Sequence, residues 1–372
     1  MLGNTKIKSL LETAVKSRAS DLHLMVGKPP ILRIDGVLQP IKNEKELSEA
    51  ALEDLIFSLL EPAKKEMFLK KLEADLSYEI SDLARFRLNL FFEKGGMALA
   101  ARIIPYRTPK MKEILMPESV YNLLVMKQGL ILVTGPTGCG KSTSLAAMIN
   151  YINDERAEHI ITLEDPIEFI FESNKSIVAQ RELGEDMLSF GDGLKHIVRQ
   201  DPDIIMVGEM RDLETIGAAI TLAETGHLIL ATLHTQNAAQ TIDRIIDVFP
   251  PYQQEQVRAQ LSLSLKAVIS QQLLPKKEGG RIAAREILMN NAAVANLIRE
   301  NKIAQIKSVI QTSAKEGMIT IDQDLKRLYK EGVVTKEAAV GHMMSPGTLD
   351  EIKVTRIMKE MFSMDDWKSR DI

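Results

Sequence analysis

Helical and strand-like hydrophobic spacing alternate over the first hundred residues. Apolar residues recur at helical intervals over 4–18 and again over 48–72. Apolar and polar residues alternate in "DLHL" and "ILRIDGVLQPI", where Asp35-Gly36 predicts the turn of a hairpin. Three further strand-like segments follow, in "ADLSYEI", "ARFRLNLFFEKGG" and "MALAARIIP". This order predicts a small α+β domain over residues 1–105.

The pattern changes after "YRTPKMKEILMPES", whose two prolines and clustered charges predict a linker at 106–116. Short runs that are almost continuously apolar then recur between helical or mixed segments. These runs are residues 130–134, 159–165, 203–210 and 227–234. Runs that are apolar on both faces are typical of a parallel sheet covered on both sides. We therefore expect a RecA-like α/β domain over 117–290, followed by a helical region over 291–372.

The amino-acid composition argues against several classes of protein. Of the 372 residues, 45% are hydrophobic and 26% charged, which is ordinary for a globular protein. The net charge of −4 argues against a nucleic-acid partner, because such proteins usually carry a basic excess. No apolar run approaches the roughly 20 residues that span a bilayer, and the N-terminus has helical spacing rather than a signal-peptide core. The single cysteine excludes an internal disulfide. We expect a cytoplasmic protein without direct membrane insertion.

The stretch "GPTGCGKST" predicts a phosphate-binding loop. It follows the apolar run "LILVT", precedes a helical segment and matches G-x-x-x-x-G-K-[ST]. Glycines let backbone N–H groups turn inward around phosphates, and the helix N-terminus adds partial positive charge. We expect Lys141 to reach the β and γ oxygens of ATP and Ser142 to hold Mg²⁺. The predicted nucleotide-binding residues are Gly135, Pro136, Thr137, Gly138, Cys139, Gly140, Lys141, Ser142 and Thr143.

Three later motifs supply candidate catalytic side chains. "ITLEDPIEF" places Glu164 at the carboxyl end of the next strand, where a carboxylate can polarise water for attack on a phosphate. "DPDIIMVGEMRD" carries Glu209 after an apolar strand, as a magnesium-linked acid acting directly or through water. In "AETGHLILATLHT", His227 and His234 flank a strand and either sense phosphate or fill the core. No cysteine or third histidine is placed to complete a zinc site.

In this order the motifs resemble those of the secretion and pilus ATPase superfamily, as Walker A, Asp box, atypical Walker B and His box. The Gly-Glu ending of the third motif is usual in that family. "ASDLHL" and "PPILRIDG" look like the start of its N-terminal PAS-like domain. The resemblance implies an ATP hydrolase that uses Mg²⁺. The implied roles are general base for Glu164, Walker B acid for Glu209 and phosphate sensing for His227 and His234.

Within the superfamily, the chain resembles the PilT-type retraction ATPases of type IV pili. The single cysteine excludes the four-cysteine zinc module of pilus-assembly and type II secretion ATPases. "AVANLIREN" (293–301) is similar to the segment AIRNLIRE, with Ala295 in place of arginine. In the family this segment is needed for retraction rather than for hydrolysis. Family members also direct N-terminal arginines at the nucleotide, and Arg85, Arg87 and Arg102 match in context without distinction among them.

The resemblance implies a homohexameric motor that hydrolyses ATP to retract type IV pili. Its implied partners are an inner-membrane pilus platform protein and a paralogous pilus ATPase, which would place it in the cytoplasm at the inner membrane. Three alternatives stay open: a pilus-extension or type II secretion ATPase, a RecA-like nucleic-acid translocase, and a regulatory module that no longer hydrolyses ATP. The acidic balance argues against the second, and the presence of both candidate acids argues against the third.

Overall fold

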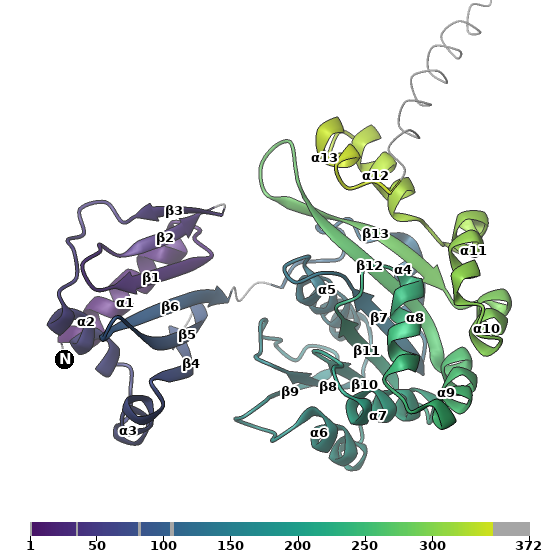
Figure 1. Cartoon of the computed structure of the whole chain (residues 1–372), viewed down its shortest axis with the longest axis horizontal. Helices are drawn as coiled ribbons and strands as arrows, with labels where there is room; N and C mark the ends of the chain where they lie inside the picture. The colour runs from purple at the N-terminus through teal and green to yellow at the C-terminus, as the bar shows by residue number, and fades with distance from the viewer. Residues whose placement is uncertain (1, 35, 81–82, 105–107, 345–372) are drawn as a thin grey trace, which may run out of the picture. The chain divides into compact units, whose positions relative to one another are not determined.

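The computed structural model describes residues 2–34, 36–80, 83–104 and 108–344. It contains two compact units (Figure 1), one made largely of residues 1–108 with the short segment 168–170, and one made of the rest. Three predicted features lie outside the described residues. They are the turn residue Asp35, the first part of the linker at 106–107 and the end of the C-terminal region from 345 onward.

The first unit is an antiparallel sheet packed against helices. Its six strands have the order β3-β2-β1-β6-β5-β4. Alternate positions of β1 and β5 are buried, because successive side chains of a strand point to opposite faces. The buried face shares one core with apolar residues of α1, α2 and α3. The elements are α1 (Leu2–Lys16), β1 (Asp21–Met25), β2 (Ile31–Ile34), β3 (Val37–Pro40), α2 (Glu49–Phe57), α3 (Pro62–Lys71), β4 (Glu73–Ile80), β5 (Ala84–Glu93) and β6 (Gly96–Ile104).

The second unit is built on a seven-stranded sheet of order β13-β12-β7-β11-β10-β8-β9. Neighbouring strands are parallel except for β13, which is antiparallel to β12. Every residue of β7, β10 and β11 is buried, which confirms the predicted parallel sheet covered on both faces. The strands are β7 (Gly129–Thr134), β8 (His159–Glu164), β9 (Ile177–Glu182), β10 (Ile204–Val207), β11 (Leu228–Leu233), β12 (Leu265–Pro275) and β13 (Arg281–Met289).

Helices cover this sheet and continue beyond it. One core joins alternate residues of the central strands to helices from α6 to α11, and α5 packs against β7. A smaller core joins the end of the β12–β13 hairpin to α12 and α13 (Figure 1), which confirms the helical C-terminal region. The helices are α4 (Glu118–Leu123), α5 (Lys141–Glu155), α6 (Phe190–Ile197), α7 (Leu213–Glu224), α8 (Ala238–Asp247), α9 (Pro251–Ser264), α10 (Ala292–Arg299), α11 (Ile306–Thr312), α12 (Ile321–Lys330) and α13 (Lys336–Val340). None of the helices among the described residues is both long and apolar enough to cross a membrane.

Residues 109–116, within the predicted linker, fold with the second unit. Met111 and Met116 are buried there. The buried guanidinium of Arg285, on β13, donates from Nη1 to the carbonyl oxygen of Ile114 at 3.0 Å. Because a buried guanidinium needs acceptors, this contact holds the segment against β13.

Candidate functional site

The candidate site lies along one edge of the seven-stranded sheet. The strands β7, β11, β10 and β8 are neighbours in that order and run parallel. The phosphate-binding loop follows β7, His234 follows β11, Glu209 comes just after β10 and Glu164 ends β8. The carboxyl ends of parallel strands meet at one edge, which is where α/β sheets bind ligands. The fold therefore brings all four sequence motifs side by side.

The phosphate-binding loop is packed tightly where it leaves β7. Gly135 has a φ of 141°, a conformation that side chains disfavour. A Cβ atom built on this glycine would lie 2.3 Å from the carbonyl oxygen of Gln271 and 2.6 Å from Sγ of Cys139. The loop ends at Gly140, the N-cap of α5, so that the first N–H groups of α5 have no partner within the helix. These donors can bind an anion.

Lys141 is the cation of this loop and is held by loop carbonyls. Its side chain is buried, and Nζ donates to the carbonyl oxygens of Gly135 at 2.9 Å and Pro136 at 3.2 Å. The same Nζ lies 3.3 Å from Nδ1 of His234. A buried ammonium needs such acceptors, and phosphate oxygens can replace them.

His234 joins Lys141 to the acid after β10. Its Nε2 lies 3.0 Å from Oε1 of Glu209, while Nη2 of Arg211 donates to Oε2 of the same carboxylate at 2.7 Å. Burial raises the pKa of Glu209, but the interactions with Arg211 and His234 outweigh it, so the pKa lies below its ordinary value of 4.5. Glu209 is therefore an anion at neutral pH. Arg211 was not among the residues predicted from the sequence.

The glycine before Glu209 has a structural reason. The backbone N–H of Gly208 donates to the carbonyl oxygen of Leu163 at 2.7 Å, and Thr232 donates from its hydroxyl to the Gly208 carbonyl. A Cβ atom on Gly208 would lie 3.1 Å from that Leu163 oxygen, closer than most real contacts. A small residue is needed where β10 passes β8, and the acidic side chain then comes at the next position.

Glu164 is a buried carboxylate with fixed hydrogen bonds. Thr162 donates to its Oε1 at 2.6 Å, and Nε2 of Gln180 donates to the same atom at 3.0 Å. Sequence reasoning missed both donors. Thr162 could have been found, because residues two apart on a strand share a face. Gln180 belongs to β9, whose pairing with β8 no local pattern predicts.

His227 does not lie at this edge, and the expectation that both histidines sense phosphate here is corrected. Its carbonyl oxygen accepts from the N–H of Gly129 at the start of β7, whereas the phosphate-binding loop follows the end of β7. Its Nδ1 lies 3.1 Å from the carbonyl oxygen of Leu222 in α7. His234 is seven positions after His227, which corresponds to about 23 Å of strand at about 3.3 Å per residue.

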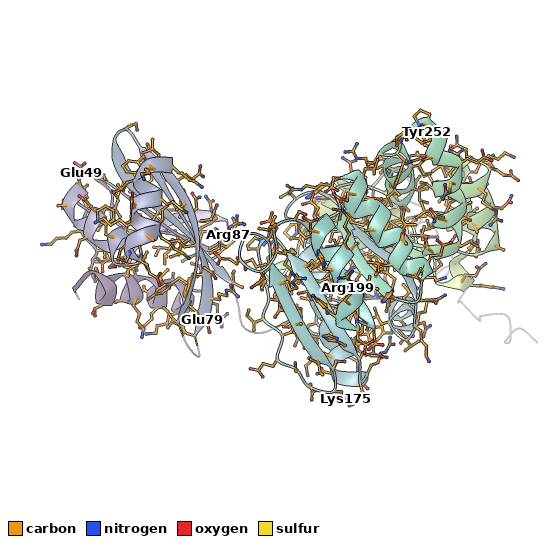
Figure 2. The ribbon with its side chains drawn as sticks, turned by 90° about the horizontal axis from the view of Figure 1, so that it is seen from below. Glu49, Glu79, Arg87, Lys175, Arg199 and Tyr252 are labelled. Carbon is orange, nitrogen blue, oxygen red and sulfur yellow. The ribbon has the colours of Figure 1, made fainter. Side chains whose placement is uncertain are left out.

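The three predicted arginines belong to the first unit. Arg102 on β6 donates from Nε to Asp21 at 3.0 Å, and Arg85 on β5 donates to Ser77 at 2.6 Å. Arg87, labelled in Figure 2, lies 3.5 Å from a carboxylate oxygen of Asp75. Each guanidinium has an acceptor within its own sheet, and contact with nucleotide stays a prediction.

The oxygen donors near the loop suit Mg²⁺. The hydroxyl of Ser142 belongs to the first turn of α5, and Glu209 supplies an ionised carboxylate. Hydroxyl and carboxylate oxygens are hard donors that Mg²⁺ prefers, and at nucleotide sites this ion takes its other ligands from phosphates and water. Within the described part of the chain, no three His, Cys, Asp or Glu side chains are grouped to hold a metal. Cys139 is buried, and burial raises the pKa of its thiol, which favours a space-filling role.

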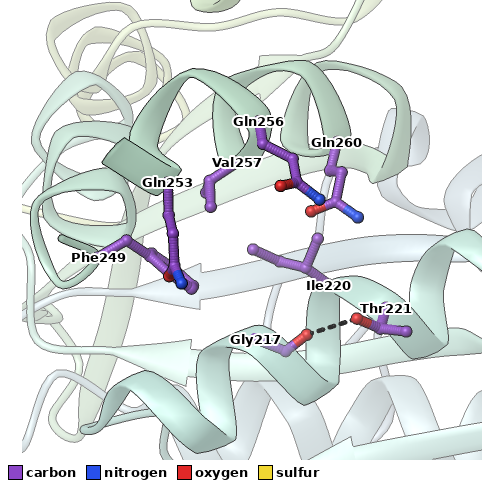
Figure 3. A pocket seen from close by; sticks show the side chains of 8 residues that line it. All are labelled: Gly217, Ile220, Thr221, Phe249, Gln253, Gln256, Val257 and Gln260. Carbon is purple, nitrogen blue, oxygen red and sulfur yellow. Dashed lines mark hydrogen bonds between the residues drawn. The ribbon is translucent and has the colours of Figure 1, made fainter. Parts of the chain in front are cut away.

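A separate cavity of about 290 Å³ lies between α7 and α9 (Figure 3). Ile220, Phe249 and Val257 contribute apolar atoms, and Gln253, Gln256 and Gln260 extend amides beside them. None of the described residues that line it belongs to the phosphate-binding loop or carries a charge. The cavity is thus distinct from the candidate nucleotide site.

Comparisons with known proteins agree with this site. Residues 4–341 match the family described as "Type II/IV secretion system protein". The type IV pilus retraction ATPase PilT of Pseudomonas aeruginosa is 48% identical over 90% of this chain and 96% of its own. The twitching motility protein of Neisseria gonorrhoeae is also 48% identical, over 90% of this chain and 89% of its own.

A solved structure is similar over the same length. The pilus retraction motor PilT with bound ADP superposes with a TM-score of 0.85 and 46% identity, covering 92% of this chain and 98% of that one. The family match covers residues 4–341, and the sequence identities of 46–48% extend over about 90% of the chain, so the similarity includes the sequence as well as the fold. The chain therefore belongs to the type II/IV secretion system protein family, as a PilT-type ATP hydrolase.

Proposed function

We propose that this chain forms a homohexameric motor that hydrolyses ATP to retract type IV pili. One observation carries the proposal: Lys141 of the phosphate-binding loop contacts His234, and His234 contacts Glu209. It occurs in a chain that is 48% identical to a pilus retraction ATPase over nearly the full length of both. We take the first unit to be the PAS-like domain, which its antiparallel sheet supports.

Nucleotide binding would use groups already assembled at the loop. The N–H groups from Gly135 to Thr143 would surround the phosphates, and Lys141 would exchange its carbonyl acceptors for β and γ oxygens. Ser142, and Glu209 through water, would hold Mg²⁺, which supplies charge neutralisation on those oxygens.

Hydrolysis would use the acids and His234. Glu164 would accept a proton from the attacking water, its carboxylate being oriented by Thr162 and Gln180. His234 contacts Lys141 on one side and Glu209 on the other, so a γ-phosphate that draws Lys141 away would change both contacts, and loss of the phosphate would restore them. Arg85, Arg87 or Arg102 would add positive charge from the first unit.

The energy would be coupled to motion between the two units. Residues 109–116 of the predicted linker are held to the second unit, and the linker would act as the hinge. We infer that the ring works in the cytoplasm on an inner-membrane pilus platform protein, together with a paralogous pilus ATPase.

Pilus imaging on a deletion strain tests the direction of the motor. Loss of a retraction motor leaves cells with excess pili and no twitching, and a Lys141→Ala copy of the gene fails to restore either. Cells without pili would contradict retraction and assign the chain to pilus extension instead.

A further inference from the structure

The β12–β13 hairpin contacts both the phosphate-binding loop and the segment 234–238, which leads from the end of β11 to the first residue of α8 and is called the His234 loop here. We propose that Gln271 on β12 and Glu286 on β13 are positioning residues for ATP hydrolysis. Gln271 sets the phosphate-binding loop, and Glu286 sets the His234 loop. The inference rests on the proposed hydrolysis of ATP at this site.

Gln271 ties the end of the phosphate-binding loop to the start of α5. Its side chain is 1% exposed. Nε2 donates to the carbonyl oxygen of Cys139 at 2.9 Å, and Oε1 accepts from the hydroxyl of Ser144 at 2.9 Å. The backbone oxygen of Gln271 is also the atom that leaves no room for a Cβ on Gly135. Both ends of the loop thus rest on one residue of β12.

A second contact anchors the strand before the loop. The hydroxyl of Ser270 lies 2.8 Å from that of Thr134, the last residue of β7. Both hydroxyl groups are buried. Because the loop starts at the next residue, β12 fixes its origin as well as its end.

Glu286 holds the far end of the His234 loop. Its Oε1 accepts the N–H of Ala238, the first residue of α8, at 3.0 Å. Ala238 is fully buried, and an N–H in the first turn of a helix has no partner within that helix. The carboxylate therefore satisfies a donor that water does not reach, at a helix end that favours negative charge.

The loop has little freedom between its two ends. Asn237 caps α8, its Oδ1 accepting from the N–H of Gln240 at 2.9 Å, and the Thr235 hydroxyl lies 2.7 Å from that of Thr241. His234 is attached directly to the end of β11. A shift of α8 away from Glu286 would move this loop and misplace the imidazole.

Gln271 and Glu286 lie close together on one hairpin, but we expect them to affect different steps, nucleotide binding and hydrolysis. Ser270, next to Gln271, lies opposite Glu286 in the strand register. Gln271 supports the loop that binds nucleotide, so its loss should raise the KM for ATP. Glu286 supports the histidine placed at the γ-phosphate, so its loss should lower kcat.

Steady-state ATP hydrolysis by the purified full chain tests this division. Gln271→Ala is expected to raise the KM for ATP by about tenfold with a smaller change in kcat, since small displacements at a site have effects of this order. Glu286→Ala is expected to lower kcat by about tenfold with KM within about twofold. Glu286→Gln retains an oxygen acceptor for the Ala238 N–H and should restore most of kcat.

The matched control is Ser48→Ala, which removes the side-chain acceptor at the start of α2, in the first unit. It should lower the urea midpoint without changing kcat or KM. If Glu286→Ala does not fold, Glu286→Asp withdraws the carboxylate by one methylene and should lower kcat in the same way. Gln271→Glu, which loses the donor to Cys139, serves likewise for Gln271.

Two results would overturn the inference in an active wild-type enzyme. The first result is that the Gln271 and Glu286 variants have the same kinetic constants as Ser48→Ala. The other is a Glu286→Gln enzyme as impaired as Glu286→Ala. A wild-type chain without ATP turnover would instead overturn the proposed function.

Discussion

Among single residues, His234 connects more of the nucleotide site than any sequence motif implies. Lys141 can donate to its Nδ1, and its Nε2–H can donate to Glu209. This hydrogen-bond pattern fits the tautomer that carries its proton on Nε2. A phosphate that draws Lys141 away would free Nδ1 and alter the contact with Glu209, which is how the residue could register nucleotide.

Replacing each histidine in turn tests this placement. His234→Ala is expected to lower kcat for ATP on the order of 10²-fold, because it removes the side chain that positions Lys141 and Glu209, and misplacement of site groups has effects of this order. His227→Ala removes a contact to Leu222 at the opposite edge of the sheet and should leave kcat within about threefold. Equal losses of kcat in the two variants would contradict the assignment.

The pairing of Arg211 with Glu209 predicts a pH dependence of stability. The folded-state pKa of Glu209 lies below 4.5, so its ionised form stabilises the folded chain above about pH 4.5, and this contribution is lost as the pH falls through the lowered value. Arg211 is largely exposed, so Arg211→Ala should cost only about 0.2–1 kcal/mol. Urea unfolding should show a larger difference between Arg211→Ala and the wild type at pH 7 than at pH 3. If the stability difference between Arg211→Ala and the wild type grew toward pH 3, the stabilising pairing of Arg211 with Glu209 would be excluded.

At the scale of elements, the loop between β7 and α5 is constrained most where it leaves the strand. Gly135→Ala introduces a Cβ atom 2.3 Å from a backbone oxygen, whereas a Cβ on Gly138 meets nothing within 4 Å. Both glycines have positive φ, so both alanines are strained by about 1–2 kcal/mol. We expect Gly135→Ala to unfold at clearly lower urea concentration than Gly138→Ala. Equal midpoints would show that β12 does not confine the loop.

The sequence predicts the elements that carry one local pattern and misses those defined by pairing. The apolar runs that became β7, β8, β10 and β11 are recognisable because both faces are buried. The segments of β9, β12 and β13 were not identified as strands, since their partners lie far away in sequence. The contacts of Glu164 with Gln180 and of Cys139 with Gln271 were missed for the same reason.

The candidate site was likewise predictable only where local patterns place its residues. Lys141, Glu209 and His234 lie together because parallel strands present their carboxyl ends at one edge of the sheet, and their roles stay predictions. His227 was grouped with them because it shares a motif with His234, although the motif spans the whole strand. The reason for Gly208 is the close approach of β10 to β8, which no local pattern predicts.

At the scale of the whole molecule, the chain combines an antiparallel unit with an ATP-hydrolysing unit. The phosphate-binding loop and the acids lie on the second unit, and the candidate arginines lie on the first. In a motor, a chemical step in one rigid body changes the position of that body relative to another. A chain of two compact units meets this requirement. The β12–β13 hairpin then links the nucleotide loops to the C-terminal helices that pack on its end.

Steady-state ATP hydrolysis by the purified full chain and its Glu164→Gln variant tests the central claim most directly. The account predicts Mg²⁺-dependent turnover for the wild type. It predicts a loss of at least about 10²-fold for the variant, which should still bind ATP because Glu164 lies outside the phosphate-binding loop. Turnover by the variant at the wild-type rate would contradict the account, as would a wild-type chain that binds ATP without hydrolysing it.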